Sequence, residues 1–274
     1  MSLPLPSTMS PSKISAFKQC PLAFRFSVID GLPEPPSPAA SKGTLVHRAL
    51  ELLMVRPPDE RTLDAALTDL ERARLDLVHH PEFSGLGLTG DELAVFQAEA
   101  AELVRRYFLL EDPGRVRAIG LELRISIQVG GLTLRGIIDR LELDADGELV
   151  VTDYKTGTAP AEGFEQDRLG GVHFYSLLCE RLLGRRPSRV QLMYLSTPEV
   201  LSTSPSQQSV EAMERRAVAL YAAVERACQR EDFRPHRSRL CDYCNFRAYC
   251  PAWGGDPARA VELREDAAAV LSAV

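Results

Sequence analysis

The chain has 274 residues, of which 45% are hydrophobic and 26% are charged, and its formal net charge is -6. These values are typical of a globular protein with one sizeable core and exclude a strongly basic protein, although a local basic groove is compatible with them. No apolar run approaches the ~20 residues that span a bilayer and the N-terminus lacks a signal-peptide pattern, so we expect a cytoplasmic protein whose six cysteines do not form a disulfide framework.

The N-terminal segment predicts a short helix between two loops. Residues 1–9 read as a loose tail. Ser10-Pro11 is typical of the N-cap and first position of a helix, which we expect to end near Cys20. The Pro- and Ser-rich stretch 31–41 then predicts a surface connection.

The following residues have helical periodicity. Residues 42–53 predict an amphipathic helix that carries His47 near its start. On this pattern alone, His47 is a partly buried helix residue. Helical periodicity then continues over residues 60–111, so we expect a helical insertion at 55–115.

After this insertion the hydrophobic period becomes that of a strand. Apolar and polar residues alternate from Leu121 to Val129, which predicts a strand with one buried face. Gly130-Gly131 predicts a turn into a second strand that carries Asp139. The stretch 144–147, Asp-Ala-Asp-Gly, predicts a hairpin into a third strand that ends at Lys155. We therefore expect three consecutive antiparallel strands.

This hairpin predicts a metal site. Asp153 and Lys155 are two residues apart in a strand, so their side chains share a face, and the hairpin can bring Asp139 beside them. Two carboxylates can hold Mg²⁺, and an adjacent ammonium can orient a water or stabilise charge on a phosphate. The alternative is that these acids are ordinary turn or strand-end residues. Glu122 either joins the acidic cluster or is a solvated strand residue.

The remaining core consists of helices around a further strand. A helix is expected over residues 167–183, which include Tyr175, and a buried strand over 189–195. A long helix over about 210–230 follows. The whole pattern predicts an α/β (α+β) fold in which a mixed central sheet is flanked by helices.

Three cysteines lie close together near the C-terminus. Cys241, Cys244 and Cys250 form a C-x2-C-x5-C-P motif, which has the spacing of a metal-binding site. The fourth ligand is Cys20, which would give a site of four cysteines, or His236, which would give a site of three cysteines and one histidine. Both zinc and an iron–sulfur cluster accept such ligands. Either centre would staple the two ends of the chain together.

These motifs together resemble the RecB-like nucleases of the PD-(D/E)XK superfamily, and specifically the type with a four-cysteine iron–sulfur cluster. Such domains occur in bacterial helicase–nucleases and in CRISPR-adaptation exonucleases. The matching stretches come in the family's order and are Ser10 to Pro21, Gly43 to His47, Gly136 to Arg140, Asp153 to Gly157 and Cys241 to Pro251.

The resemblance implies a restriction-endonuclease-like core and a single elaborated nuclease domain over residues 1–274. The cluster segment would comprise residues 10–26 and 233–255. The implied ligands of Mg²⁺ or Mn²⁺ are His47, Asp139, Asp153 and the carbonyl of Tyr154, and the implied catalytic residues are Asp139, Asp153 and Lys155. The implied ligands of a 4Fe–4S cluster, rather than zinc, are Cys20, Cys241, Cys244 and Cys250.

The resemblance also implies a substrate, and the chain departs from the family pattern at one position. We expect a DNA nuclease, in particular a single-strand exonuclease of DNA repair or recombination, with Tyr175 contacting DNA and a helicase as a partner. The family has Gln four residues before this Tyr, where the present chain has Gly171. The alternatives are a non-catalytic or weakly active DNA-binding subunit of a helicase–nuclease complex and a zinc-stapled structural partner.

Overall fold

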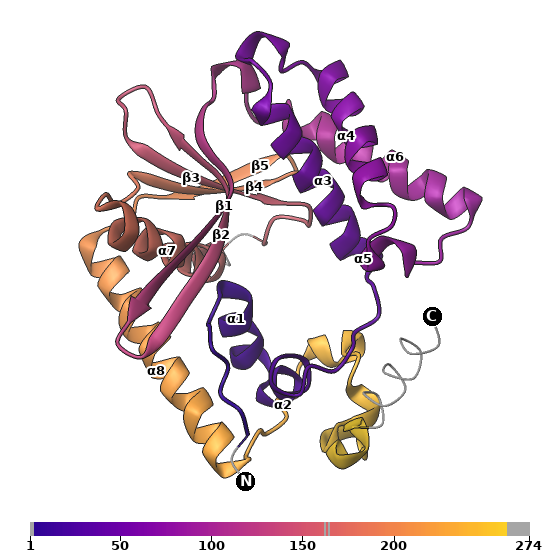
Figure 1. Ribbon diagram of the computed structural model, residues 1–274, viewed down its shortest axis with the longest axis vertical. Coiled ribbons are helices and arrows are strands. Elements are labelled where there is room, and N and C mark those ends of the chain that lie inside the picture. Colours follow the sequence, from indigo (N-terminus) through magenta and orange to yellow (C-terminus); the bar gives the residue numbers. More distant parts are fainter. Residues whose placement is uncertain (1–2, 162, 164, 262–274) are drawn as a thin grey trace. The chain divides into compact units, whose positions relative to one another are not determined.

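The computed structural model describes residues 3–161, 163 and 165–261, with backbone alone for 165–170 and 261. It divides into two compact units. The sheet unit consists of Pro36–Ile127 and Gly136–Met213, and the cysteine unit consists of Met1–Pro35, Gln128–Arg135 and Glu214–Val274. Figure 1 labels the helices and strands of both units.

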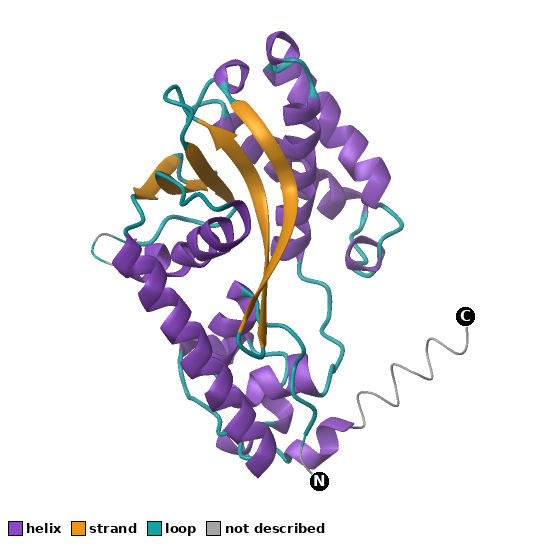
Figure 2. Cartoon of the chain, turned by 60° about the vertical axis from the view of Figure 1, so that its left-hand side comes forward, coloured by secondary structure: helices purple, strands orange, loops and turns teal. Residues whose placement is uncertain are grey.

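The sheet has, among the described residues, five strands in the order β1-β2-β3-β4-β5. Their bounds are β1 (Arg117–Val129), β2 (Leu132–Leu143), β3 (Leu149–Lys155), β4 (Arg189–Tyr194) and β5 (Glu199–Thr203). The two-residue turn at Gly130-Gly131 makes β1 and β2 a hairpin, and Figure 2 shows both as long, curved strands. The pair β2–β3 is antiparallel, β3–β4 parallel and β4–β5 antiparallel.

Helices flank the sheet on both faces in the two views (Figures 1 and 2). Helix α7 (Glu165–Leu183) connects the parallel strands β3 and β4, as a crossover must. It packs closely on β2, where a Cβ added at Gly136 would meet a Leu178 side-chain atom at 2.8 Å. The opposite face, which includes Tyr154 and Met193, packs into the hydrophobic core formed with α3, α4 and α6.

The helices on that opposite face begin with typical caps. These helices are α3 (Pro38–Val55), α4 (Leu63–Leu77), α5 (Pro81–Ser84) and α6 (Gly90–Tyr107). The Ser37 and Thr62 side chains accept N–H bonds at the start of α3 and α4, and Thr89 and Glu92 form a capping box on α6. The long helices α3, α4 and α6 then each bury one apolar stripe.

The cysteine unit contains short helical segments. It includes α1 (Pro11–Gln19), α2 (Pro21–Phe24), the π-helix η1 (Arg25–Ile29) and the 3-10 segments η4 (Arg239–Tyr243), η5 (Arg247–Tyr249), η6 (Pro251–Trp253) and η7 (Pro257–Val261). Helix α8 (Gln207–Arg230) begins in the sheet unit and ends in the cysteine unit. As predicted, Ser10 caps α1, and its side chain accepts the N–H of Lys13.

The structure corrects two of the predictions for connecting segments. The prediction that residues 1–9 form a loose tail is wrong at Met9. The side chain of Met9 is fully buried, and its backbone forms a β-bridge with Leu134. The prediction of a surface connection over 31–41 is wrong from Pro38 onward, because helix α3 begins there with Ser37 as its N-cap. Strand β5 was not expected. Among the described residues no helix is long and apolar enough to cross a membrane.

Candidate metal centre and cysteine pocket

The hairpin β2–β3 places Asp139 beside the last residues of β3. Arg140 pairs with Thr152 in the register of the two strands, and the backbone N–H of Tyr154 donates to Asp139 Oδ2 at 2.7 Å. Asp139 is thus held by the strand that carries Asp153 and Lys155. The sequence predicted this proximity, and the structure brings these residues together.

Helix α3 brings His47 to the same place. Its Nε2 lies 3.1 Å from the carbonyl oxygen of Tyr154. Because a carbonyl oxygen only accepts hydrogen bonds, Nε2 carries the proton and Nδ1 carries the free lone pair. This Nδ1 lies 3.5 Å from Asp139 Oδ2 and 3.9 Å from Glu122 Oε1. His47 is therefore oriented by Tyr154 with its ligand atom directed at two carboxylates.

Glu122 on β1 completes this group. Ligand atoms of His47, Glu122 and Asp139 lie within 4.8 Å of one another, a set of one imidazole and two carboxylates. The backbone of Glu122 has φ +43°, a left-handed conformation that is unfavourable for a residue with a Cβ. Burial alternates on both sides of Glu122 but in opposite phase: Ala118 and Gly120 are the less exposed residues before it, and Ile125 and Ile127 are buried after it. Strand periodicity could not have predicted the turn of Glu122 toward the site.

Asp153, Lys155 and Tyr175 lie next to this group. Asp153 is buried and forms an ion pair with the Lys155 ammonium, whose side chain is 44% exposed. Burial alone would lower the pKa of Lys155, but Asp153 holds this pKa above its ordinary value. Tyr175 on α7 faces the same carboxylates: burial raises the pKa of its hydroxyl, and the charges of Asp153 and Asp139 raise it further.

The carboxylates of the site repel one another. Burial raises the pKa of Asp139, and the charge of Asp153 raises it further. Burial also raises the pKa of Glu122, with Asp139 as the next cause, while burial lowers the pKa of His47 and favours its neutral form. Neutral imidazole and crowded carboxylates are the donor set of a divalent cation, which would relieve this repulsion. The residues present therefore fit Mg²⁺ or Mn²⁺.

A glycine substitution can separate the conformational cost of Glu122 from its function as a metal ligand. Glu122→Gly should stabilise the metal-free protein by about 1 kcal/mol, because glycine adopts positive φ without penalty. It should also weaken Mn²⁺ binding by about tenfold or more, because a ligand is lost. Thermal melts and a metal titration measure both effects. The matched control is Glu231→Gly in the cysteine unit, where φ is +51°; it should stabilise without changing metal affinity. Equal metal affinities for the two variants would contradict the ligand role.

The raised pKa of Asp139 predicts how stability depends on pH. A carboxyl whose pKa is higher in the folded state than in the unfolded state contributes stability at low pH, which is lost as pH rises through the folded pKa. Without divalent metal, the unfolding free energy should therefore fall between about pH 5 and about pH 8. Added Mn²⁺ should restore it, since it binds the ionised form. Urea melts of wild type and Asp139→Asn check this, and an equal fall in the variant would contradict it.

A buried polar network lies behind the site. The guanidinium of Arg140 is fully buried; it forms ion pairs with Glu111 and Glu142 and donates to the Tyr154 hydroxyl at 2.7 Å. Tyr154 thus connects this network to the candidate metal site. Its hydroxyl bonds Arg140 on one face, while its backbone N–H and carbonyl hold Asp139 and His47. The structure therefore links the position of two candidate ligands to this network.

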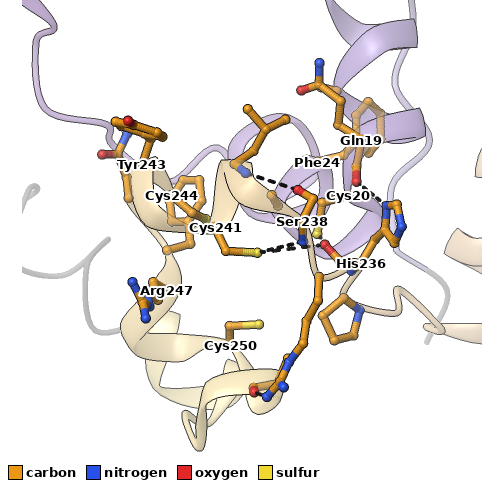
Figure 3. A pocket seen from close by; sticks show the side chains of 18 of the residues that line it. Gln19, Cys20, Phe24, His236, Ser238, Cys241, Tyr243, Cys244, Arg247 and Cys250 are labelled. Carbon is orange, nitrogen blue, oxygen red and sulfur yellow. Dashed lines mark hydrogen bonds between the residues drawn. The ribbon is translucent and has the colours of Figure 1, made fainter.

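The cysteine unit contains a second candidate site. One pocket of about 330 Å³ is lined by Cys20, Cys241, Cys244 and Cys250 (Figure 3). Burial raises the pKa of the Cys244 thiol, and the other three cysteines raise it further, so the four thiols are near neighbours. Backbone N–H groups of His236 and Ser238 donate to the sulfurs of Cys20 and Cys241, each at 3.4 Å. The structure thus brings all four predicted cysteines to one pocket.

The alternative ligand His236 also lines this pocket. Its Nδ1 lies 2.9 Å from the carbonyl oxygen of Gln19 and therefore donates to it, as Figure 3 shows. Among the described residues, neither His236 nor the cysteines form a group of three ligand atoms within 4.8 Å of one another. The four cysteines that line the pocket suit either an iron–sulfur cluster or a zinc ion.

Comparison with known proteins identifies the family. The sequence profile of the PD-(D/E)XK nuclease superfamily matches residues 8–251. The chain belongs to this superfamily. Its mixed α/β fold, in which helices flank a five-stranded sheet, is that of PD-(D/E)XK nucleases and was predicted correctly. Such nucleases use divalent metals, and the His47, Glu122 and Asp139 group can bind one.

The chain is also similar to two curated proteins and to one solved structure. The chain is 26% identical to Gene 69 protein of Mycobacterium phage D29 over 190 residues, which span 60% of this chain and 67% of that protein. It is 25% identical over 168 residues to Uncharacterized protein RC0550 of Rickettsia conorii, covering 57% of this chain but only 20% of that longer protein. The fold resembles a crystal structure named "Putative exonuclease" from Eubacterium rectale, with TM-score 0.53, 14% identity and 87% of each chain covered.

Proposed function

We propose that this chain is a RecB-like, metal-dependent DNA nuclease that hydrolyses phosphodiester bonds in single-stranded DNA, as an exonuclease of repair or recombination in the cytoplasm. The observation that carries this proposal is the meeting of His47, Glu122 and Asp139 beside the Asp153–Lys155 pair. A hydrolase of phosphodiesters needs a cation held by hard ligands and a nearby positive group, and both are available here.

In the proposed reaction, metal binding and charge stabilisation belong to different residues. His47, Glu122, Asp139 and Asp153 would hold Mg²⁺ or Mn²⁺, and the carbonyl of Tyr154 has a second lone pair that could contribute. The bound metal would polarise the scissile phosphate and lower the pKa of an attacking water. The Lys155 ammonium, fixed by Asp153, orients that water and stabilises the negative charge that develops on the phosphate.

Tyr175 is the proposed contact to DNA on α7. Its hydroxyl faces the two aspartates of the site. The Gln that the family has four residues earlier is replaced here by Gly171. This position is exposed, and a Cβ added there would meet nothing within 4 Å. This departure is what favours the second candidate function, a weakly active or non-catalytic DNA-binding subunit that works with a helicase.

For the cysteine pocket we propose a 4Fe–4S cluster rather than zinc. Its four thiols line one pocket of the cysteine unit and are the ligands that such a cluster takes. The backbone N–H groups of His236 and Ser238 on two of the sulfurs support this, since such bonds stabilise cluster thiolates. In this proposal the backbone N–H of His236 positions Cys20, and Cys20 supplies the fourth ligand.

The cluster has a direct test. Protein purified without oxygen should be brown, absorb near ~400 nm and contain about four irons per chain, as a four-cysteine cluster requires. Cys250→Ser should lose the colour and have a lower melting temperature than wild type, because cluster binding is coupled to folding. The control is Cys179→Ser, a buried cysteine of the sheet unit, which should keep the iron. A colourless wild type with one zinc per chain would contradict the cluster.

The experiment for the nuclease uses the same anaerobic protein. Wild type with Mn²⁺ should degrade a labelled single-stranded oligonucleotide, and Asp153→Ala should not. Asp146→Ala, an exposed acid in the turn of the same hairpin, is the matched control and should cut normally. If wild type and Asp153→Ala bind DNA but neither cuts it, the binding-subunit function replaces the nuclease. Equal cutting by both would place the active site elsewhere.

A further inference from the structure

The segment that carries the three C-terminal cysteines presents charge and aromatic rings at its surface. Residues 233–253 contain four arginines and one acid, Asp242, in a chain whose net charge is -6. Three large apolar side chains of this segment are exposed: Leu240 by 52%, Tyr243 by 85% and Trp253 by 44%. Arg234 and Arg247 pair with Asp232 and Asp242 at 3.0 and 3.2 Å, and Arg237 and Arg239 add two further guanidinium groups. Guanidinium groups beside exposed rings suit a ligand that is negative and has flat apolar groups.

Two arginines of this segment are held in place by one ring. The guanidinium carbon of Arg247 lies 4.0 Å from the Trp253 ring centroid, and that of Arg237 lies 4.9 Å from it. Arg247 also donates to Asp242 at 3.2 Å, and Arg237 donates to the carbonyl of Ala252. A guanidinium has five N–H donors, so each still has donors for another acceptor. Stacking thus orders both cations before any ligand binds.

Tyr243 differs from the other aromatic residues near the cysteines. Phe24 and Phe246 are buried, Phe24 packing on Phe17 and Phe246 on Phe26, so they form the apolar shell of the pocket. Tyr243 adjoins Cys244, lines the mouth of the pocket and points away from it in Figure 3. A large ring that exposes 85% of its area contributes little to folding and offers a face for stacking.

We propose that Arg237, Tyr243, Arg247 and Trp253, here termed the arginine–aromatic face, bind single-stranded nucleic acid. The ordered guanidinium groups would bind phosphate oxygens, and Tyr243 would stack on a base. This inference rests on the proposed function, because it assigns a second binding surface to the same substrate class. A partner protein is the other ligand class that exposed aromatic residues attract. The two guanidinium groups ordered on Trp253 favour a ligand with phosphate oxygens.

The test measures binding without cleavage. A fluorescein-labelled oligothymidylate of about 20 nucleotides, longer than a typical single-strand site, is titrated with the anaerobic full chain in buffer without divalent metal. Tyr243→Ala should weaken binding about tenfold, as expected for a lost stacking ring, and Tyr243→Phe should restore it. Arg247→Ala should weaken binding and lower the slope of log K against log salt by roughly 0.7, the contribution of one phosphate contact.

The matched control is Arg115→Ala in the sheet unit. Arg115 pairs with Asp112 at 3.3 Å, as Arg247 pairs with Asp242 at 3.2 Å, but no aromatic ring is recorded over its guanidinium in the described part of the chain. This control should leave the affinity and the salt slope unchanged. Melting temperature and metal content of each variant establish that the cysteine unit is intact.

The outcomes separate this inference from the proposed function. Weaker binding by Tyr243→Ala and Arg247→Ala supports the arginine–aromatic face even if wild type cleaves nothing. Wild-type affinity in both variants overturns it even if Asp153 proves essential for cleavage, and the face is then a protein-binding surface. An equal loss in Arg115→Ala also overturns it, since the effect is then one of net charge.

Discussion

Lys155→Ala should lower kcat for single-stranded DNA by about 10²–10³-fold, the usual cost of removing one donor to a developing negative charge. The pKa of Lys155 is raised by Asp153, so the side chain is a cation at neutral pH and not a general base. Its loss should therefore reduce kcat and kcat/KM together, with little change in KM for DNA. Single-turnover and steady-state kinetics at saturating Mn²⁺ measure these values.

The metal dependence of the Lys155 variant distinguishes catalysis from ligation. Removing a cation from beside Asp153 and Asp139 makes the site more negative, so half-saturation by Mn²⁺ should not rise. Lys42→Ala is the matched control, because Lys42 forms an ion pair with Glu99 in the same unit; its activity should match that of wild type. A rise in the Mn²⁺ requirement of Lys155→Ala, with kcat restored by excess metal, would show that Lys155 only supports the metal site.

The hairpin could be predicted because the residues that determine it are close together in the sequence. Strand alternation, the Asp-Ala-Asp-Gly turn and the i, i+2 rule together place Asp139 beside Asp153 and Lys155 without knowledge of the rest of the fold. The parallel pairing of β3 with β4 is not local, but a long helix between two strands implies it. These patterns explain why the mixed sheet with flanking helices could be predicted.

Glu122 shows where such prediction ends. Its sequence position assigns it to the polar face of a strand, which is compatible with solvent as well as with the site. Its side chain reaches His47 because the backbone adopts φ +43° there, and no residue preference predicts a left-handed glutamate. Met9 was missed for a related reason: its pairing partner Leu134 is distant in sequence, and a Pro- and Ser-rich tail looks unstructured.

The cysteines fall between these two cases. Their spacing predicted three ligands, but the prediction of a fourth from the other end of the chain came from the family resemblance, and the structure places Cys20 in the same pocket. In the structure Cys20 and His236 both line the pocket, and the Nδ1 of His236 bonds to the carbonyl of Gln19. Sequence spacing also does not distinguish zinc from an iron–sulfur cluster, because both accept four cysteine ligands.

Arg140→Met should lower the free energy of unfolding by about 3–5 kcal/mol, the cost of breaking a buried ion pair by removing one partner. The variant leaves the carboxylates of Glu111 and Glu142 without the guanidinium that they share. It also frees the Tyr154 hydroxyl, so that the backbone that holds Asp139 and His47 is less well fixed. Urea denaturation should show the stability loss, and calorimetric titration should show weaker Mn²⁺ binding.

Two further variants separate charge from position in this network. Arg140→Met combined with Glu111→Gln and Glu142→Gln should recover part of the lost stability, because no buried charge is then unpaired. Tyr154→Phe should cost only about 1 kcal/mol, since it removes one hydrogen bond, yet it should still weaken Mn²⁺ binding if the network positions the ligands. The surface control Arg185→Met, which breaks a pair with Glu148, should cost at most ~1 kcal/mol. If Tyr154→Phe and Arg140→Met both bind Mn²⁺ as wild type does, the network stabilises the fold alone, and the metal site owes its geometry to the strands themselves.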